Sequence, residues 1–107
     1  MYIAVRNDLT PGLQAAQAVH AAFFFAQKYP EVTQEWLADS QYLVIVAVES
    51  SEALWELNHK AYSANIPFSV WSEPDLNDEV TAIAFAPSAA SRILCANLPL
   101  AGKMKGK

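Results

Sequence analysis

The chain has 107 residues, which is enough for one small domain with a single hydrophobic core. Hydrophobic residues make up 53% of the sequence and charged residues 17%, and this composition excludes an intrinsically disordered chain. The net charge of −4 argues against strong nonspecific binding to nucleic acid, although it leaves room for a local basic patch.

A strand followed at once by a helix opens the sequence. The apolar run Tyr2 to Val5 predicts a first strand. Thr10 can cap a helix and Pro11 suits a first helical turn, so we expect a helix from Pro11 to about Lys28. The turn between them lies at the carboxyl end of a strand and beside a helix N-terminus, where open α/β sheets usually place ligands. This turn contains three polar residues: Arg6, Asn7 and Asp8.

One face of the predicted helix carries two polar residues, Gln17 and His20, among apolar ones. The spacing i, i+3, i+4, i+7 places five residues on that face: Leu13, Ala16, Gln17, His20 and Phe24. Two interpretations stay open for the polar pair. They are either hydrogen-bonded structural residues or part of a site that faces the preceding turn.

Strands and helices alternate along the rest of the chain. The expected elements are a helix over 31–38, a strand buried on both faces over 41–48, a helix that begins at Ser50 or Ser51 and is ended by Asn65 and Pro67, a strand over 68–71, an acidic loop over 72–79, a buried strand over 80–86 and a helix over 88–96. The order predicts the α/β class, as a three-layer α/β/α sandwich with a four-stranded mixed sheet. The loop over 72–79 is too short for a crossover helix, so the two strands it joins can pair antiparallel. We expect one domain over residues 1–102 and a basic tail over 103–107.

Single residues and long apolar runs give further expectations. The lone Cys95 cannot form an internal disulfide and is expected to be a buried small hydrophobe. His59 is expected on a solvent-facing helix surface, and the three tryptophans as core or interface anchors. We expect neither a signal peptide nor a membrane span, and therefore a cytoplasmic protein.

Three segments near the N-terminus together resemble the type-2 peptidyl-tRNA hydrolase family. They are Asn7-Asp8-Leu9, the turn Thr10-Pro11-Gly12, and Ala15-Ala16-Gln17-Ala18-Val19-His20-Ala21. The family has Thr-Asp-Leu, a Gly-Lys-rich turn and Ala-Ala-Gln-x-x-His-Ala at these places. Thr81 to Pro87 is similar to its last strand, Thr-Val-Leu-x-Ile-Gly-Pro. Glu73-Pro74-Asp75 occupies the place of its Asp-Ala-Gly segment, whose acid faces the active site.

The resemblance implies hydrolysis of the ester between a peptide and the 3′ end of tRNA by activated water, with no metal or cofactor. It implies that His20, Glu73 or Asp75 orients or deprotonates the water, and that Thr81 positions the water or the substrate carbonyl. The implied substrate-binding residues are Arg6, Asn7, Asp8, Gln14 and Gln17. The implied partner is tRNA, and family members are commonly homodimers.

Several alternatives stay open. Thr81 can serve the sheet alone, Glu73 and Asp75 can be solvated turn acids, and Asp8 can cap the turn and fix Arg6. Leu13 and Gln14 stand where the family has a lysine, and seven basic residues are few for a tRNA-binding protein. A non-catalytic binding or regulatory module with the same fold is therefore one alternative. A hydrolase of small acyl esters that does not use tRNA is the other.

Overall fold

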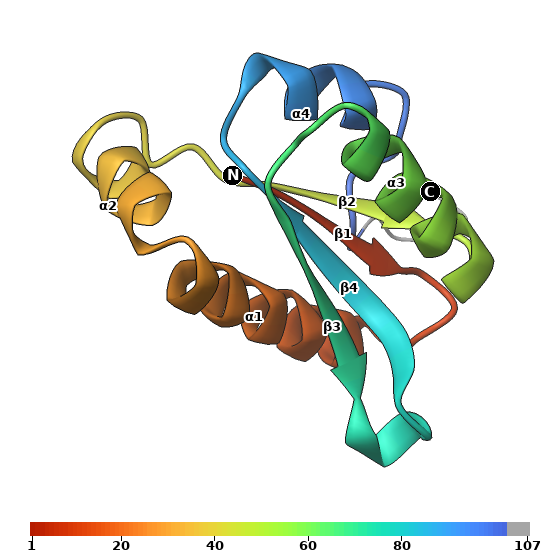
Figure 1. Ribbon diagram of the computed structural model, residues 1–107. Coiled ribbons are helices and arrows are strands. Elements are labelled where there is room, and N and C mark those ends of the chain that lie inside the picture. The colour runs from red at the N-terminus through yellow and green to blue at the C-terminus, as the bar shows by residue number, and fades with distance from the viewer. Residues whose placement is uncertain (103–107) are drawn as a thin grey trace.

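The computed structural model describes residues 1–102, and the predicted tail over 103–107 lies outside this range. Within residues 1–102 the strands and α-helices, labelled in Figure 1, are β1 (Tyr2–Arg6), α1 (Pro11–Lys28), α2 (Pro30–Ala38), β2 (Val44–Val48), α3 (Ser51–Ser63), β3 (Phe68–Glu73), β4 (Glu79–Phe85) and α4 (Ala89–Cys95). The sheet order is β2-β1-β4-β3, with β1 and β2 parallel and β4 antiparallel to both of its neighbours. The predicted α/β class and mixed four-stranded sheet are therefore confirmed.

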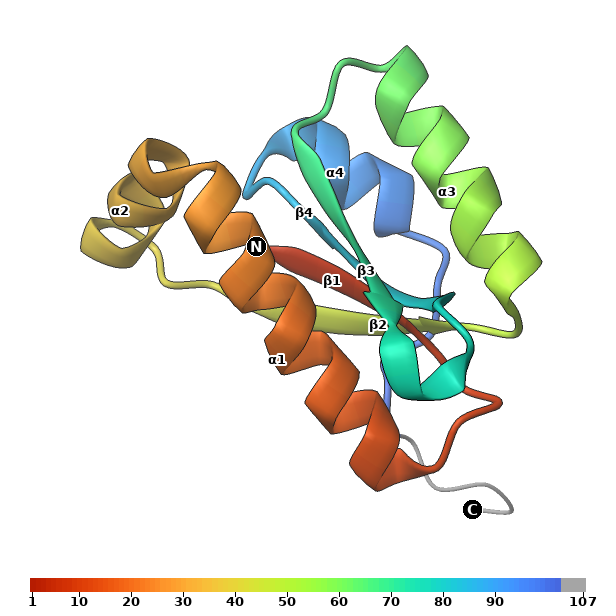
Figure 2. The same cartoon turned by 60° about the horizontal axis from the view of Figure 1, so that its bottom comes forward.

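The helices cover the two faces of the sheet as separate layers (Figure 2). On one face, α1 buries Ala18, Ala21 and Phe25 against apolar residues of β1 and β4. On the other face, α3 buries Leu54 and Leu57 in a second core that also holds Cys95 of α4. Alternate strand residues supply each core because successive side chains in a strand point to opposite faces. None of the helices within residues 1–102 has the length and apolar character needed to cross a membrane.

The ends of α1 are set by the residues that the sequence indicated. Thr10 has extended backbone angles, and its hydroxyl oxygen accepts a hydrogen bond from the Leu13 amide at 3.4 Å. Pro11 occupies the first turn, and Tyr29 ends the helix just before Pro30 begins α2. The predicted bounds of α1 are thus confirmed. The later helices end slightly earlier than expected, at Ser63 and Cys95.

The strand predicted over 41–48 is shorter and less buried than expected. It begins at Val44, which pairs with Tyr2 at the start of β1, and Gln41 before it adopts a positive φ of 57°. It is also an edge strand, so Val44 and Ile45 are only partly buried. The segment after α4 borders this edge: the Ala47 amide donates to the Pro99 carbonyl and the Ala101 amide to the Ile45 carbonyl, each at 2.9 Å.

The acidic loop predicted over 72–79 is mostly strand and tight turn. Strand β3 continues to Glu73, a 3-10 turn spans Pro74–Leu76, and β4 begins at Glu79. Asn77 and Asp78 make the reversal with positive φ values of 55° and 58°. Because the turn is this tight, the acidic side chain of Glu73 is held on the sheet and does not lie in a free loop.

Candidate active site

Four polar side chains from three elements form a connected series, which we call the Gln17 cluster: Thr81, Gln17, Glu73 and His20. The Thr81 hydroxyl donates to Gln17 Oε1 at 2.8 Å. Gln17 Nε2 donates to Glu73 Oε1 at 3.0 Å, and His20 Nδ1 lies 3.7 Å from the same carboxylate oxygen. Both polar atoms of the Gln17 amide are therefore occupied, and this fixes which way the amide faces.

Local structure explains why these residues meet. Gln17 and His20 are three positions apart on α1 and so share one helix face. The register of β3 and β4 pairs Trp71 with Ala82 but Ser72 with Val80, so Thr81 is the extra residue of a β-bulge. A bulge changes the direction of a side chain, and here the Thr81 side chain points to the face of the sheet that α1 covers.

Exposure rises steadily along the cluster from the core to the solvent. Thr81 is 0% exposed and Gln17 1%, while the side chain of Glu73 is 12% exposed and that of His20 46%. The Gln17 hydrogen bond, followed by the Asp75 backbone amide at 3.3 Å, lowers the pKa of Glu73 below its usual value. The cluster therefore presents a half-exposed imidazole beside an ionised and firmly held carboxylate.

Aromatic rings pack around His20. The Trp71 ring lies 4.7 Å from the His20 ring at an interplanar angle of 41°, and Phe24 meets Trp71 edge-on at 6.0 Å. Trp71 precedes Glu73 by two positions in β3, so both side chains are on the same face. From the sequence, Trp71 was expected only as a core or interface anchor, and its link to Glu73 follows from the continuation of β3 to Glu73.

The predicted substrate-binding residue Arg6 belongs to a different cluster. Its guanidinium donates to both carboxylate oxygens of Asp8, at 3.0 and 2.8 Å, and to Glu79 at 2.7 Å. Asp8 is the main cause of the raised pKa of Arg6, and the bonds from Arg6 lower the pKa of Asp8. Arg6 is 8% exposed. It lies two positions after Ala4 in β1, so its side chain points to the same face of the sheet as that of Ala4, which is the face covered by α3. The sheet therefore separates Arg6 from the Gln17 cluster. Asp8 holds the Arg6 side chain in place, which is one of the roles that the sequence left open for Asp8.

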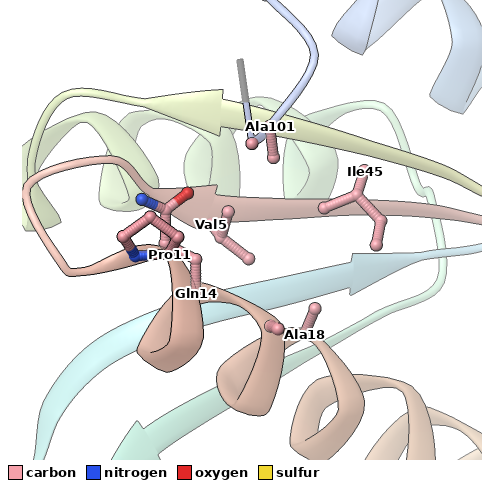
Figure 3. Close-up of a pocket in the computed structure, with 8 residues that line it drawn as sticks. Val5, Pro11, Gln14, Ala18, Ile45 and Ala101 are labelled. Carbon is pink, nitrogen blue, oxygen red and sulfur yellow. The ribbon is translucent and has the colours of Figure 1, made fainter. Parts of the chain in front are cut away.

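The other predicted site residues are spread around the start of α1. Asn7 and Asp75 are exposed, and Asp75 meets the cluster through its backbone amide. Gln14 lines a hollow of about 170 Å³ together with Val5, Ala18 and Ile45 of β2. Figure 3 shows these side chains around the hollow. Its Nε2 donates to the Leu9 carbonyl at 2.7 Å. Of the two loop acids that the sequence left open, only Glu73 places its carboxylate against Gln17 and His20.

The arrangement suits proton transfer better than metal binding. Residues 1–102 contain no group of three histidine, cysteine or acidic residues that could hold a metal ion. Cys95 is buried on the opposite face, as expected, and burial raises its thiol pKa to about 11. A half-exposed histidine backed by a carboxylate is a suitable general base for water, because the carboxylate stabilises the imidazolium that forms.

Comparison with known proteins gives two consistent matches. Residues 1–96 match the family model described as Peptidyl-tRNA hydrolase PTH2. The chain is also 31% identical over 103 residues to a protein of Methanocaldococcus jannaschii named peptidyl-tRNA hydrolase, and this alignment covers 87% of the chain and 90% of the relative. The matched region includes all four residues of the Gln17 cluster.

Proposed function

This chain belongs to the Peptidyl-tRNA hydrolase PTH2 family, and from that premise we propose that it hydrolyses the ester joining a peptide to the 3′ end of tRNA. The observation that carries the proposal is the contact of His20 with Glu73, whose carboxylate Gln17 anchors from the core. It supplies an exposed base with a fixed, ionised partner. This is the requirement for activating water at neutral pH.

In the proposed reaction, His20 takes a proton from water while the water oxygen bonds to the ester carbonyl carbon. The bond from that carbon to the ribose oxygen then breaks, and the imidazolium returns its proton to the ribose oxygen. Glu73 stabilises the imidazolium between these two steps. Gln17 and Thr81 act as positioning residues, because both are buried and their polar atoms are engaged within the cluster.

Hydrolysis of an N-acetylated aminoacyl-tRNA tests the proposal directly. We expect release above the buffer rate, and a decrease of about 10²- to 10⁴-fold in His20→Ala. The matched control is His59→Ala, because His59 is exposed on α3, away from the cluster. Equal rates for the wild type and buffer, or full activity in a folded His20→Ala protein, would contradict the proposal.

A binding module without catalysis is the second candidate, and the N-terminal turn of α1 supports it. Leu13, which is 40% exposed, and Gln14 stand where the family has a lysine. This candidate predicts tRNA binding with no release of the peptide. A hydrolase of small esters instead predicts turnover of simple acyl esters at a rate that added tRNA does not change.

We further propose a homodimer that acts in translation in the cytoplasm. The name of the family, peptidyl-tRNA hydrolase, supports a role in translation in the cytoplasm. Exposed apolar residues on the outer side of α1 support self-association, since Val19 is 52% exposed and Phe23 73%. Gel filtration combined with light scattering tests it, and a mass equal to one chain would count against the dimer.

A further inference from the structure

A second hollow lies away from the Gln17 cluster, where the C-terminal ends of α1 and α3 meet the start of β3. Its volume is about 600 Å³. Tyr29 and Lys28 line it from the α1 side, Tyr62 and Asn65 from the α3 side, and Phe68 from β3. Tyr62 is 76% exposed, so its ring is available for contact. Three aromatic rings and one ammonium group therefore border a single open space.

The charges of this hollow differ from those of the chain as a whole. The sequence contains 11 acidic residues, but none of the residues that line this hollow is acidic. Lys28 is exposed, with Nζ 3.4 Å from the Phe68 carbonyl oxygen and 5.4 Å from the centre of the Tyr29 ring. Its charge faces no carboxylate there, in contrast to that of Arg6, which two carboxylates neutralise.

A stripe of α1 connects the hollow to the Gln17 cluster. His20, Phe24 and Lys28 follow one another at intervals of four and therefore lie along one side of the helix. At 1.5 Å per residue, Lys28 is about 12 Å along the axis from His20. Phe24 is 42% exposed between them, and its ring meets that of Trp71 in β3. Figure 2 shows α1 running alongside β3. The exposed ring of Phe24 and the partly buried ring of Trp71 thus lie between the proposed ester site and the hollow.

We propose that this hollow and the stripe leading to it hold the unpaired 3′ nucleotides of the tRNA. The inference rests on the proposed function, which places the ester at His20. Aromatic rings beside a cation are the usual means of binding single-stranded RNA, because every base can stack on a ring and every nucleotide brings a phosphate. A peptide would use the rings but gain nothing general from Lys28, so the combination favours RNA.

Fluorescence anisotropy with uncharged tRNA tests the inference without any ester chemistry. We expect Tyr62→Ala and Lys28→Gln each to weaken binding by about tenfold, and Tyr62→Phe to retain it. Lys28→Gln should also reduce the slope of log K against log salt by about 0.7, as loss of one phosphate contact requires. Lys60→Gln and Tyr42→Ala are matched controls, since neither residue lines the hollow, and they should bind normally.

Removing the unpaired 3′ nucleotides from the tRNA should weaken binding to the wild type and abolish the difference between the wild type and Tyr62→Ala. Unchanged binding in both hollow variants would overturn the inference, and would leave the proposed function standing if the wild type still releases peptide. If Tyr62→Ala and Lys28→Gln raise KM for the ester substrate but bind uncharged tRNA as tightly as the wild type does, the hollow would be assigned to the peptide instead. Binding that depends on Tyr62 and Lys28 without any hydrolysis would reject the proposed function alone.

Discussion

Thr81 and Gln17 are 64 positions apart in the sequence, yet the Thr81 hydroxyl donates a hydrogen bond of 2.8 Å to the Gln17 side chain inside the protein. This bond fixes the orientation of the amide and thus directs Gln17 Nε2 to Glu73. The carboxylate that contacts His20 is therefore positioned from the core outward. Changes at the buried end should consequently affect both folding and hydrolysis.

Thr81→Val should lower stability by about 1–3 kcal/mol, because it leaves the buried Gln17 Oε1 without a donor. It should also reduce kcat more than it changes KM, since the amide is then free to turn away from Glu73. Thr81→Ser keeps the hydroxyl and should restore most of both losses. Urea unfolding and steady-state hydrolysis measure the two effects, and a fully active, stable valine variant would show that the bond positions nothing.

Glu73→Gln should reduce hydrolysis by about 100-fold or more, because a neutral amide cannot stabilise the imidazolium of His20. The Gln17 bond lowers the pKa of Glu73, so the carboxylate is ionised throughout the neutral range. Its support of the His20 imidazolium is therefore available at neutral pH, where steady-state hydrolysis by the wild type and the variant is compared. Asp75→Asn is the control: Asp75 reaches the cluster through its backbone, so its rate should stay near that of the wild type. A folded Glu73→Gln protein that hydrolyses the substrate at the wild-type rate would contradict this role for Glu73.

Arg6→Met should destabilise the fold by about 1–3 kcal/mol at neutral pH, since it removes the ion pairs with Asp8 and Glu79 from a mostly buried position. The pKa of Asp8 is lower in the folded protein than in the unfolded chain. The ion pair of Asp8 with Arg6 therefore contributes fully to the free energy of unfolding above the pKa that Asp8 has in the unfolded chain. This contribution is lost as the pH falls through the pKa that Asp8 has in the folded protein. The stability difference between wild type and variant should accordingly shrink below about pH 4. Urea unfolding across pH measures this, and a difference that grows in acid would reject the ion pair as its source.

Asp78→Gly should stabilise the protein by about 1 kcal/mol, because Asp78 holds a positive φ of 58° that costs a non-glycine residue conformational energy. This gain corresponds to a rise of about 4–8 °C in Tm. Asn77→Gly should give a smaller gain, since asparagine tolerates the left-handed region better. Calorimetry tests the pair, and a lower Tm for Asp78→Gly would mean that its side chain contributes more than the backbone strain costs.

Local signals in the sequence determined most of the fold. The Thr10-Pro11 start of α1, the β-branched strands and the Ser50 cap of α3 depend on near neighbours, and these elements form close to where the residues predict them. The polar pair Gln17 and His20 was also visible, because helical spacing is a local property. The N-terminal segment resembled the family to which the chain belongs.

Only the tertiary structure decided which of the candidate residues meet. Strand order placed β2 at the edge, where Val44 and Ile45 are only partly buried although Val46, Ala47 and Val48 stay in the core. The bulge at Thr81 depends on the pairing of β3 with β4, and it brings that hydroxyl to Gln17. The alternation of β1 sent Arg6 to the opposite face, and the tight turn selected Glu73 over Asp75. The strand order, the pairing of β3 with β4 and the helix that covers each face of β1 depend on contacts between distant segments, and such contacts form no pattern within a short stretch of sequence.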